Sequence, residues 1–229
     1  MNNVLCSCAE CKLRSLFFFH VSPIGLENMC TNKIEQQYDK GEIIITEGDP
    51  IHYFSYLKTG LVKLSKNTDG NKTQIISFAK PFDFVSLLSV FSSPIYNYSV
   101  TALEETTICI INLDEIKEIA LKNGEFTMNL MVRVSEATDR IILNNLEIRR
   151  KNLKGRVAYV ILFFANHIYQ SNKFELPISR REIAEYIGMS TENVIRTMSE
   201  FRRDHILKFD GKQIEIVNEK LLETISEHG

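Results

Sequence analysis

The sequence predicts an α+β protein built from an N-terminal β-roll (jelly roll), one long helix and a C-terminal winged helix-turn-helix. Three observations lead to this prediction. Short apolar runs separated by turn dipeptides fill residues 38–113. A helical pattern without Pro or Gly covers Phe126–Arg149. A capped helix, a glycine turn and a second amphipathic helix follow between Ser179 and Leu207.

Residues 1–37 are predicted to form a tail and a helix, and they carry a group of cysteines. Cys6, Cys8 and Cys11 lie in one short polar stretch, and Cys30 stands alone in the predicted helix. No secretory signal or membrane-spanning run occurs, so we expect a cytoplasmic protein with reduced thiols and no membrane partner. Thiols this dense are typical of metal ligands or redox sensors, although a tail with incidental thiols gives the same pattern. We expect Cys30 to be structural.

Residues 38–123 are predicted to form the β-roll. β-Branched residues recur in short runs, and dipeptides such as Thr59-Gly60 and Asp69-Gly70 separate these runs as turns. Many short strands at this spacing are typical of a sandwich or jelly roll. The expected strands are Ile43–Thr46, Tyr53–Lys58, Leu61–Leu64, Lys72–Phe78, Tyr98–Ala102 and Thr107–Asn112.

Residues 124–150 are predicted to form a dimerisation helix. Apolar residues within Phe126–Arg149 recur at alternating spacings of four and three, which is the heptad pattern of a helix that pairs with a parallel copy. A helix of about 24 residues would be about 36 Å long. A core helix lying on the β-roll is the alternative, and the position between two domains favours the dimer helix. The expected seam is Leu130, Val134, Ala137, Ile141, Asn144 and Ile148.

Residues 151–229 are predicted to form a winged helix domain. Ser179 and Glu182 make a capping box, so a helix begins at residue 180. Gly188 can adopt the left-handed conformation that ends this helix, and Ser190 can cap the next one. The apolar residues of the second helix follow a helical spacing and are expected to face inward: Val194, Met198 and Phe201.

The outer face of the second helix is polar and basic, which indicates contact with double-stranded DNA. Glu192 and Arg196 lie one turn apart, where Arg can reach guanine O6 and N7 and Glu can accept from cytosine N4. A solvated face with an ion pair between these two residues is the alternative. The position directly after a capped helix and a glycine turn favours DNA. The expected contacts are Ser190, Thr191, Glu192, Ile195, Arg196, Ser199 and Arg202.

A predicted hairpin follows the second helix and would form the wing. Its strands are Leu207–Phe209 and Lys212–Ile216, joined by an Asp210-Gly211 turn. We expect Lys208 and Lys212 to contact phosphates, which position a protein on DNA without reading its sequence.

The bulk composition argues against other function classes. The chain has 229 residues and a formal net charge of -2, so it is not a general polyanion binder. Its histidines have no metal-ligand spacing, and neither a catalytic triad motif nor a phosphate-binding glycine loop is present, so we expect no enzyme. The remaining alternative is a protein-interaction or thiol/metal-binding module on the same fold. Salt would distinguish it, because DNA binding weakens steeply with ionic strength.

Several stretches resemble the Crp/Fnr family of bacterial transcription regulators. They are Lys40-Gly41-Glu42 with Glu47-Gly48-Asp49, Ala102-Leu103-Glu104-Glu105-Thr106, Asn152–Ala158 and the helix-turn-helix itself. The resemblance covers nearly the whole chain. It implies a sensory roll like a cyclic-nucleotide-binding domain, a homodimer, a two-fold operator and RNA polymerase as a partner. Thr191, Glu192 and Arg196 match base-reading positions, whereas Ile195 departs from the small or polar residue of several relatives.

The resemblance also bears on the ligand of the roll. Members that bind cyclic AMP have a Gly-Glu pair and an Arg-Ser or Arg-Thr pair where this chain has Ser86-Leu87 and Tyr96-Asn97, so we do not expect cyclic AMP to bind. Oxygen-sensing members hold a [4Fe-4S] cluster on cysteines. By this resemblance the four ligands would be Cys6, Cys8, Cys11 and Cys109, with Phe17 standing at the third N-terminal position. A small buried residue of a strand is the alternative role for Cys109.

Overall fold

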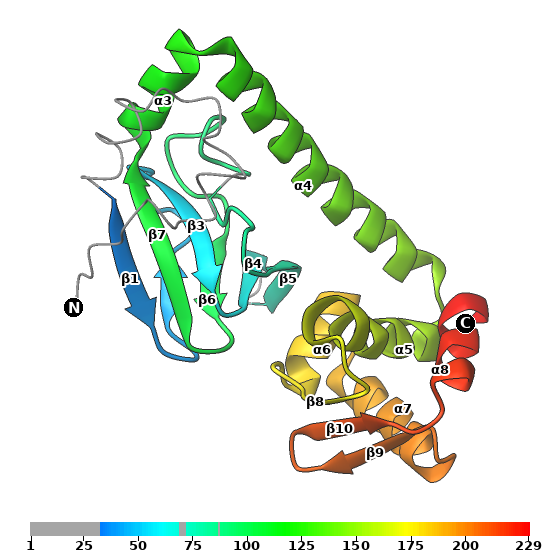
Figure 1. The fold of residues 1–229 in the computed structure, drawn as a ribbon. Coiled ribbons are helices and arrows are strands. Elements are labelled where there is room, and N and C mark those ends of the chain that lie inside the picture. The colour runs from blue at the N-terminus through cyan, green and yellow to red at the C-terminus, as the bar shows by residue number, and fades with distance from the viewer. Residues whose placement is uncertain (1–32, 69–71, 87) are drawn as a thin grey trace. The chain divides into compact units, whose positions relative to one another are not determined.

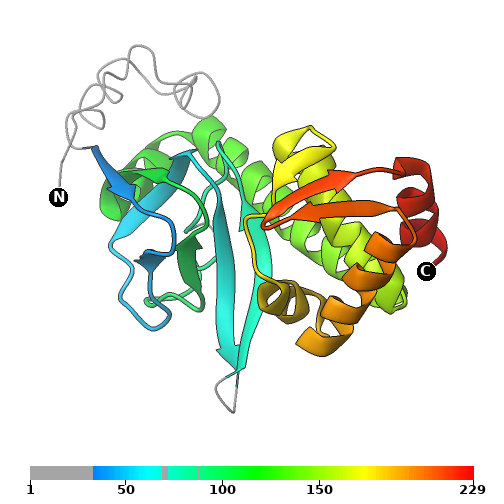
Figure 2. The same ribbon diagram turned by 90° about the horizontal axis from the view of Figure 1, so that it is seen from below.

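The computed structural model describes residues 33–68, 72–86 and 88–229 (Figures 1 and 2). The chain divides into two compact units. The first contains the described residues up to Asn67 together with Ile76–Arg140, and the second contains Thr68–Ile75 together with Ile141–Gly229.

The β-roll consists of two sheets with the strand orders β1-β7-β3 and β2-β6-β4-β5. The expected strands correspond to β2–β7. Strand β1 was not predicted, and it pairs with β7 from Ile34 opposite Ile110 to Tyr38 opposite Thr106. The roll therefore begins before the predicted boundary at residue 38. The strands are β1 (Ile34–Tyr38), β2 (Ile43–Ile45), β3 (Tyr53–Thr59), β4 (Val62–Thr68), β5 (Lys72–Ala79), β6 (Ser99–Ala102) and β7 (Thr106–Asn112).

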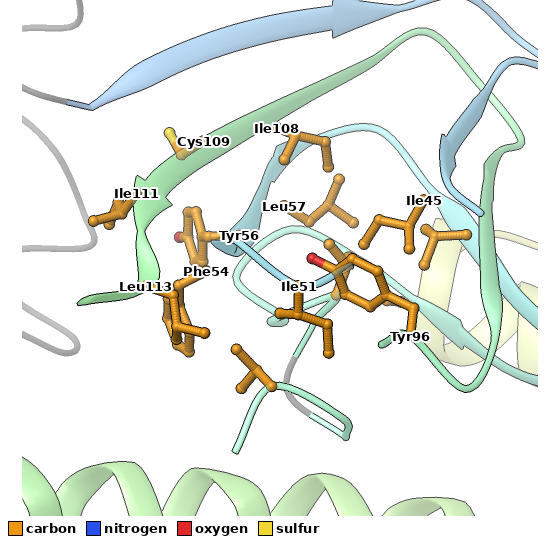
Figure 3. Close-up of a cluster of buried hydrophobic side chains, with 14 of the residues drawn as sticks. Ile45, Ile51, Phe54, Tyr56, Leu57, Tyr96, Ile108, Cys109, Ile111 and Leu113 are labelled. Atoms are coloured by element: carbon orange, nitrogen blue, oxygen red, sulfur yellow. The ribbon is translucent and has the colours of Figure 1, made fainter. Parts of the chain in front are cut away.

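Side chains from both sheets form one core (Figure 3). Ile45 comes from one sheet, and Leu57 and Ile108 come from the other, and all three are buried. The turn between β3 and β4 packs tightly against the start of β7. A Cβ added at Gly60 would lie 2.8 Å from the Cα of Thr106, and Gly60 also has φ +91°, so only glycine fits this turn.

Two helices follow β7 directly. Asn112 caps α3 (Leu113–Lys122) by accepting a hydrogen bond from the backbone N–H of Asp114 at 2.8 Å. Asn123 accepts similarly from the N–H of Phe126, at 3.0 Å, in the first turn of α4 (Gly124–Arg150). The predicted long helix is therefore present. Within the described ranges, no helix is both long and apolar enough to cross a membrane.

Several residues of the predicted heptad seam of α4 pack within their own chain. Leu130 is part of the roll core, and Val134 and Ala137 pack against that core. The side-chain oxygen of Asn144 accepts a hydrogen bond from the Tyr159 hydroxyl at 3.0 Å. The heptad pattern marks the side of α4 that faces its own protomer.

A second apolar face lies on nearly the opposite side of α4, at about 100° per residue around the helix. Its large apolar side chains are exposed, and Ser135 and Asp139 lie among them at the same helical phase. We call this surface the outer face of α4. Its apolar members are Met128, Met131, Val132, Ile142, Leu143 and Leu146.

The second unit contains the helix-turn-helix and a small sheet of strand order β8-β10-β9. Asn152 caps α5 by accepting from the N–H of Gly155 at 3.1 Å. Strand β8 and helix α8 were not predicted. The elements are α5 (Leu153–Phe163), the π-helix η2 (Phe164–Tyr169), β8 (Lys173–Glu175), α6 (Arg180–Ile187), α7 (Thr191–Arg203), β9 (Leu207–Asp210), β10 (Gln213–Ile216) and α8 (Glu219–His228).

Candidate nucleic-acid interface

The local signals that predicted the helix-turn-helix are confirmed. The Ser179 hydroxyl accepts from the backbone N–H of Glu182 at 3.2 Å, and the Glu182 carboxylate accepts from the backbone N–H of Ser179 at 2.7 Å. Gly188 ends α6 with φ 68° and ψ 42°, a left-handed conformation. Ser190 caps α7 by accepting from the N–H of Asn193 at 3.3 Å. The capping box and the glycine turn thus set both ends of the turn between the helices.

The inner face of α7 anchors this helix in the second unit. Val194, Met198 and Phe201 are all buried, as the apolar spacing predicted. Thr197 is buried as well, which the apolar pattern could not reveal because threonine is polar. Four buried side chains along one face fix the rotation of α7 about its own axis. The opposite face is therefore presented in one orientation.

That opposite face carries the expected DNA-contacting side chains. Ser190, Glu192, Arg196, Ser199 and Arg202 are exposed, and Thr191 is partly exposed. Ile195 is 47% exposed, which is a large fraction for an apolar side chain in a folded unit. An apolar group in this position can contact a thymine methyl in the major groove. The structure thus groups every predicted α7 contact on or beside one surface.

Glu192 and Arg196 do not form the ion pair on which the alternative interpretation, a solvated helix face, was based. Arg196 Nη2 instead donates to the Asn193 side-chain oxygen at 3.0 Å. The Glu192 carboxylate accepts from its own backbone N–H and from the Ser190 hydroxyl, and these hydrogen bonds lower its pKa. The ionised carboxylate of Glu192 can accept from cytosine N4. Each side chain is held separately, with donors or acceptors left for a base edge.

The wing is present, but its turn lies one residue later than predicted. Gln213 pairs with Asp210, so Gly211 and Lys212 form the two-residue turn, and Gly211 has φ +59°. Lys208 and Lys212 are both exposed. Lys208 lies 4.0 Å from Glu215, an exposed pair of the kind that contributes little to stability. Both lysines thus remain able to approach a phosphate.

The DNA contacts predicted from the sequence did not include two arginines at the start of α6. Arg180 stacks over the Phe209 ring of the wing at 5.9 Å, and Arg181 pairs with Glu185 at 2.9 Å. Cations at a helix N-terminus are disfavoured by the helix dipole, so two adjacent arginines there need a reason other than helix stability. Contact with DNA phosphates is such a reason. The Ser-Arg-Arg sequence was therefore the signal that could have identified them.

Two tyrosines in and beside the Tyr96-Asn97 segment belong to the buried core of the roll, and Figure 3 shows the Tyr96 side chain among the core residues. Tyr96 is only 7% exposed, and its hydroxyl donates to the backbone oxygen of Tyr53 at 3.3 Å. Burial, and then the charge of Asp49, raises the pKa of Tyr96 to about 12. Tyr98 donates to the backbone oxygen of Val85 at 3.0 Å. Neither phenol presents a cation to a phosphate, and Leu87 lies outside the described residues.

Cyclic AMP is therefore expected to have no effect on this protein. A cyclic phosphate needs a guanidinium or a set of backbone N–H donors, and Tyr96 offers a neutral phenol already bonded to the backbone. Titration calorimetry should show no heat of binding, and operator affinity should not change on adding the nucleotide. A nucleotide-dependent gain in DNA affinity would contradict this expectation.

Of the five cysteines, Cys109 lies within the described residues. Cys6, Cys8, Cys11 and Cys30 lie outside the described residues. Cys109 is fully buried in β7, and its thiol lies 3.6 Å from the carboxylate of Glu35. Lys58 Nζ lies 2.8 Å from each oxygen of that carboxylate. Among the described residues, no group of three or more His, Cys, Asp or Glu side chains could hold a metal.

Comparison with known proteins agrees with this architecture. Residues 35–123 match the family model of the cyclic nucleotide-binding domain, and residues 155–225 match that of the Crp-like helix-turn-helix domain. The chain is 25% identical over 221 residues to the transcriptional activator protein FnrA of Stutzerimonas stutzeri, covering 92% of this chain and 88% of FnrA. It is 26% identical over 186 residues to electron transport regulator A of Shewanella oneidensis, covering 78% of this chain and 73% of the relative.

A solved structure extends the likeness to three dimensions. FixK2 from Bradyrhizobium japonicum superposes with a TM-score of 0.74 at 27% sequence identity, covering 84% of this chain and 96% of FixK2. Along this chain, a match to the cyclic nucleotide-binding domain is followed by a match to the Crp-like helix-turn-helix domain. The relatives to which the chain is similar are transcription regulators and not enzymes. The chain belongs to the Crp/Fnr family of DNA-binding transcription regulators.

Proposed function

We propose that the protein is a homodimeric transcription regulator that reads a two-fold DNA operator with α7 and acts together with RNA polymerase. The observation that carries the proposal is the exposed face of α7, on which Glu192 and Arg196 are held apart and oriented. The wing lysines and the two arginines of α6 add sequence-independent contacts to phosphates. Base readout comes from α7, and position on the duplex comes from the surrounding cations.

The outer face of α4 supports the homodimer. Six large apolar side chains are exposed along one side of a single helix, which is costly for a side that stays in water. A parallel copy of α4 would cover this face and place the two protomers about a two-fold axis. Helix-turn-helix dimers bind half-sites about 34–36 Å apart, so the operator should be close to palindromic.

Salt dependence tests the proposal against a protein-interaction module. A dimer that neutralises 6–10 phosphates should lose roughly 10³–10⁵ in affinity between about 50 and 200 mM salt. Fluorescence anisotropy with a duplex selected from a random pool would measure this, and footprinting should show protection on two successive major grooves. A shallow salt dependence, or protection of a single groove, would argue for the protein-interaction alternative or for a monomeric reader.

The signal received by the roll is, on this proposal, redox state or oxygen, through a [4Fe-4S] cluster on Cys6, Cys8, Cys11 and Cys109. The name of electron transport regulator A supports a redox signal. The described residues supply one thiol, that of Cys109. The Glu35 carboxylate beside it does not favour an iron ligand at Cys109, because a carboxylate repels the thiolate that would bind iron. Lys58 pairs with Glu35 and can offset that repulsion only in part. Because a cluster needs four thiolates, the tail would have to supply the other three.

Anaerobic reconstitution with iron and sulfide tests this signal. The wild-type protein should bind about four iron atoms per protomer and show cluster absorption. Cys109→Ser should abolish both signals and keep the fold, because the serine hydroxyl can still donate to Glu35. Cys30→Ser is the matched control and should keep the iron. A wild-type protein that stays free of iron would rule out the cluster.

A further inference from the structure

The guanidinium of Arg156 lies where two helices, α4 and α6, end. Arg156 belongs to the first turn of α5 and is half-buried. Its Nη2 donates to the carbonyl oxygen of Arg149, in the last turn of α4, at 3.1 Å. Its Nε donates to the carbonyl oxygen of Lys151 at 2.9 Å. Its Nη1 donates to the carbonyl oxygen of Ile187, the last residue of α6, at 3.1 Å, and lies 3.5 Å from Sδ of Met189.

Two of these acceptors belong to the C-terminal turns of helices. The last four carbonyl groups of a helix have no partner within it, and they carry the negative end of the helix dipole. A cation placed where α4 and α6 both end satisfies acceptors of both helices and is attracted by both. The planar guanidinium of arginine donates in several fixed directions, whereas the ammonium group of lysine is one compact charge on a flexible stem. Arginine therefore joins the two helix ends in a way that lysine does not.

Arg156 also fixes the segment that leads into the recognition helix. The turn between α6 and α7 runs from Gly188 to Ser190, so the Ile187 and Met189 contacts hold the turn itself. Further along α5, the Tyr159 hydroxyl donates to the Asn144 side chain of α4 at 3.0 Å. Helix α5 is thus joined to α4 at two points, and one of those points also holds the turn before α7.

We infer that Arg156 is a positioning residue that sets the direction in which α7 projects from the last turn of α4. The inference rests on the homodimer proposed above. In that dimer each α4 carries one recognition helix, and both must reach half-sites separated by one turn of DNA. Arg156 governs the simultaneous binding of two half-sites and leaves the reading of a single half-site unchanged.

Two substitutions in the full chain test the inference. Arg156→Lys keeps the charge, and Arg156→Met keeps the apolar stem. The matched control is Arg150→Lys. Arg150 lies next to Arg149 in the last turn of α4, but its side chain is exposed and pairs with Glu147 at 2.8 Å. The probes are a two-fold duplex selected from a random pool with the wild-type protein, the same duplex with one half scrambled, and the same duplex with one base pair inserted at its centre.

Both Arg156 variants should bind the intact two-fold duplex about tenfold more weakly than the wild type, because part of the gain from simultaneous binding is lost. Their affinity for the half-scrambled duplex should stay within about twofold of the wild type. The inserted base pair turns one half-site by about 36° and should weaken the wild type more than the variants. Arg150→Lys should behave as the wild type on all three duplexes.

Equal losses on the intact and half-scrambled duplexes, with a lower midpoint of thermal unfolding, would show a merely structural role and overturn the inference. If the wild type binds these two duplexes equally, the homodimer proposal fails and this inference fails with it. If the wild type prefers the intact duplex and both variants keep that preference in full, the role of Arg156 alone is overturned.

Discussion

Replacing Ile142 and Leu146 together with aspartate is expected to turn the protein into monomers. Both side chains lie on the outer face of α4, where they are 51% and 57% exposed. In a parallel two-fold pairing of α4, each would lie close to its own copy. The two substitutions would therefore add four carboxylates to a seam that already holds Asp139, and like charges facing each other cost several kcal/mol.

The same double variant should lose most of its operator affinity. A monomer engages one half-site at a time, and the avidity from linking two sites is roughly 10²–10⁴. Sedimentation equilibrium measures the oligomeric state, and anisotropy with the selected two-fold duplex measures the affinity. Binding to a half-scrambled duplex should change little, because α7 is not altered.

Two further substitutions on α4 serve as controls. Arg133→Asp adds the same charge on an exposed polar side of the helix, where Arg133 pairs with Glu136 at 3.3 Å, and it should leave the dimer intact. Val134→Asp would place a charge against the roll core, and it should lower the free energy of unfolding without separating the protomers. A double variant that still sediments as a dimer would remove the outer face of α4 from the interface.

Arg196→Ala is expected to cost about 1–3 kcal/mol of binding to the specific operator and to relax the preference at one guanine. The Asn193 side chain holds the Arg196 guanidinium at 3.0 Å, so little side-chain entropy is lost when the contact to the base forms. Competition titrations against duplexes with each base at that position would measure both the cost and the lost discrimination.

Lys212→Ala provides the contrast, because Lys212 lies in the turn of the wing and is expected to contact only phosphate. It should weaken specific and random duplexes alike and reduce the slope of log affinity against log salt by about one unit. Lys220→Ala, at an exposed lysine of α8, is the control for loss of a surface charge. Equal effects of Arg196→Ala and Lys212→Ala on specific and random duplexes would contradict the assigned roles.

The helix-turn-helix could be predicted because its determinants are local in the sequence. A capping box, a left-handed glycine and an N-terminal serine act within one or two turns of their own helices. Strand β1 escaped prediction for the opposite reason. Its segment Ile34–Tyr38 is largely polar, and it becomes a strand by pairing with β7, which lies far along the chain.

By itself, the sequence determined α4, α6 and α7, the glycine turn between α6 and α7, and the inner and outer faces of α7, because hydrophobic periodicity and capping specify these features within a single element. Only the tertiary structure decided which apolar face of α4 packs against its own protomer, because periodicity shows that a side is buried and does not show what buries it. The same holds for Arg156. Its carbonyl partners in Arg149 and Lys151 are near it in the sequence, but Ile187 is distant, and only the tertiary structure brings the Ile187 carbonyl to the same guanidinium.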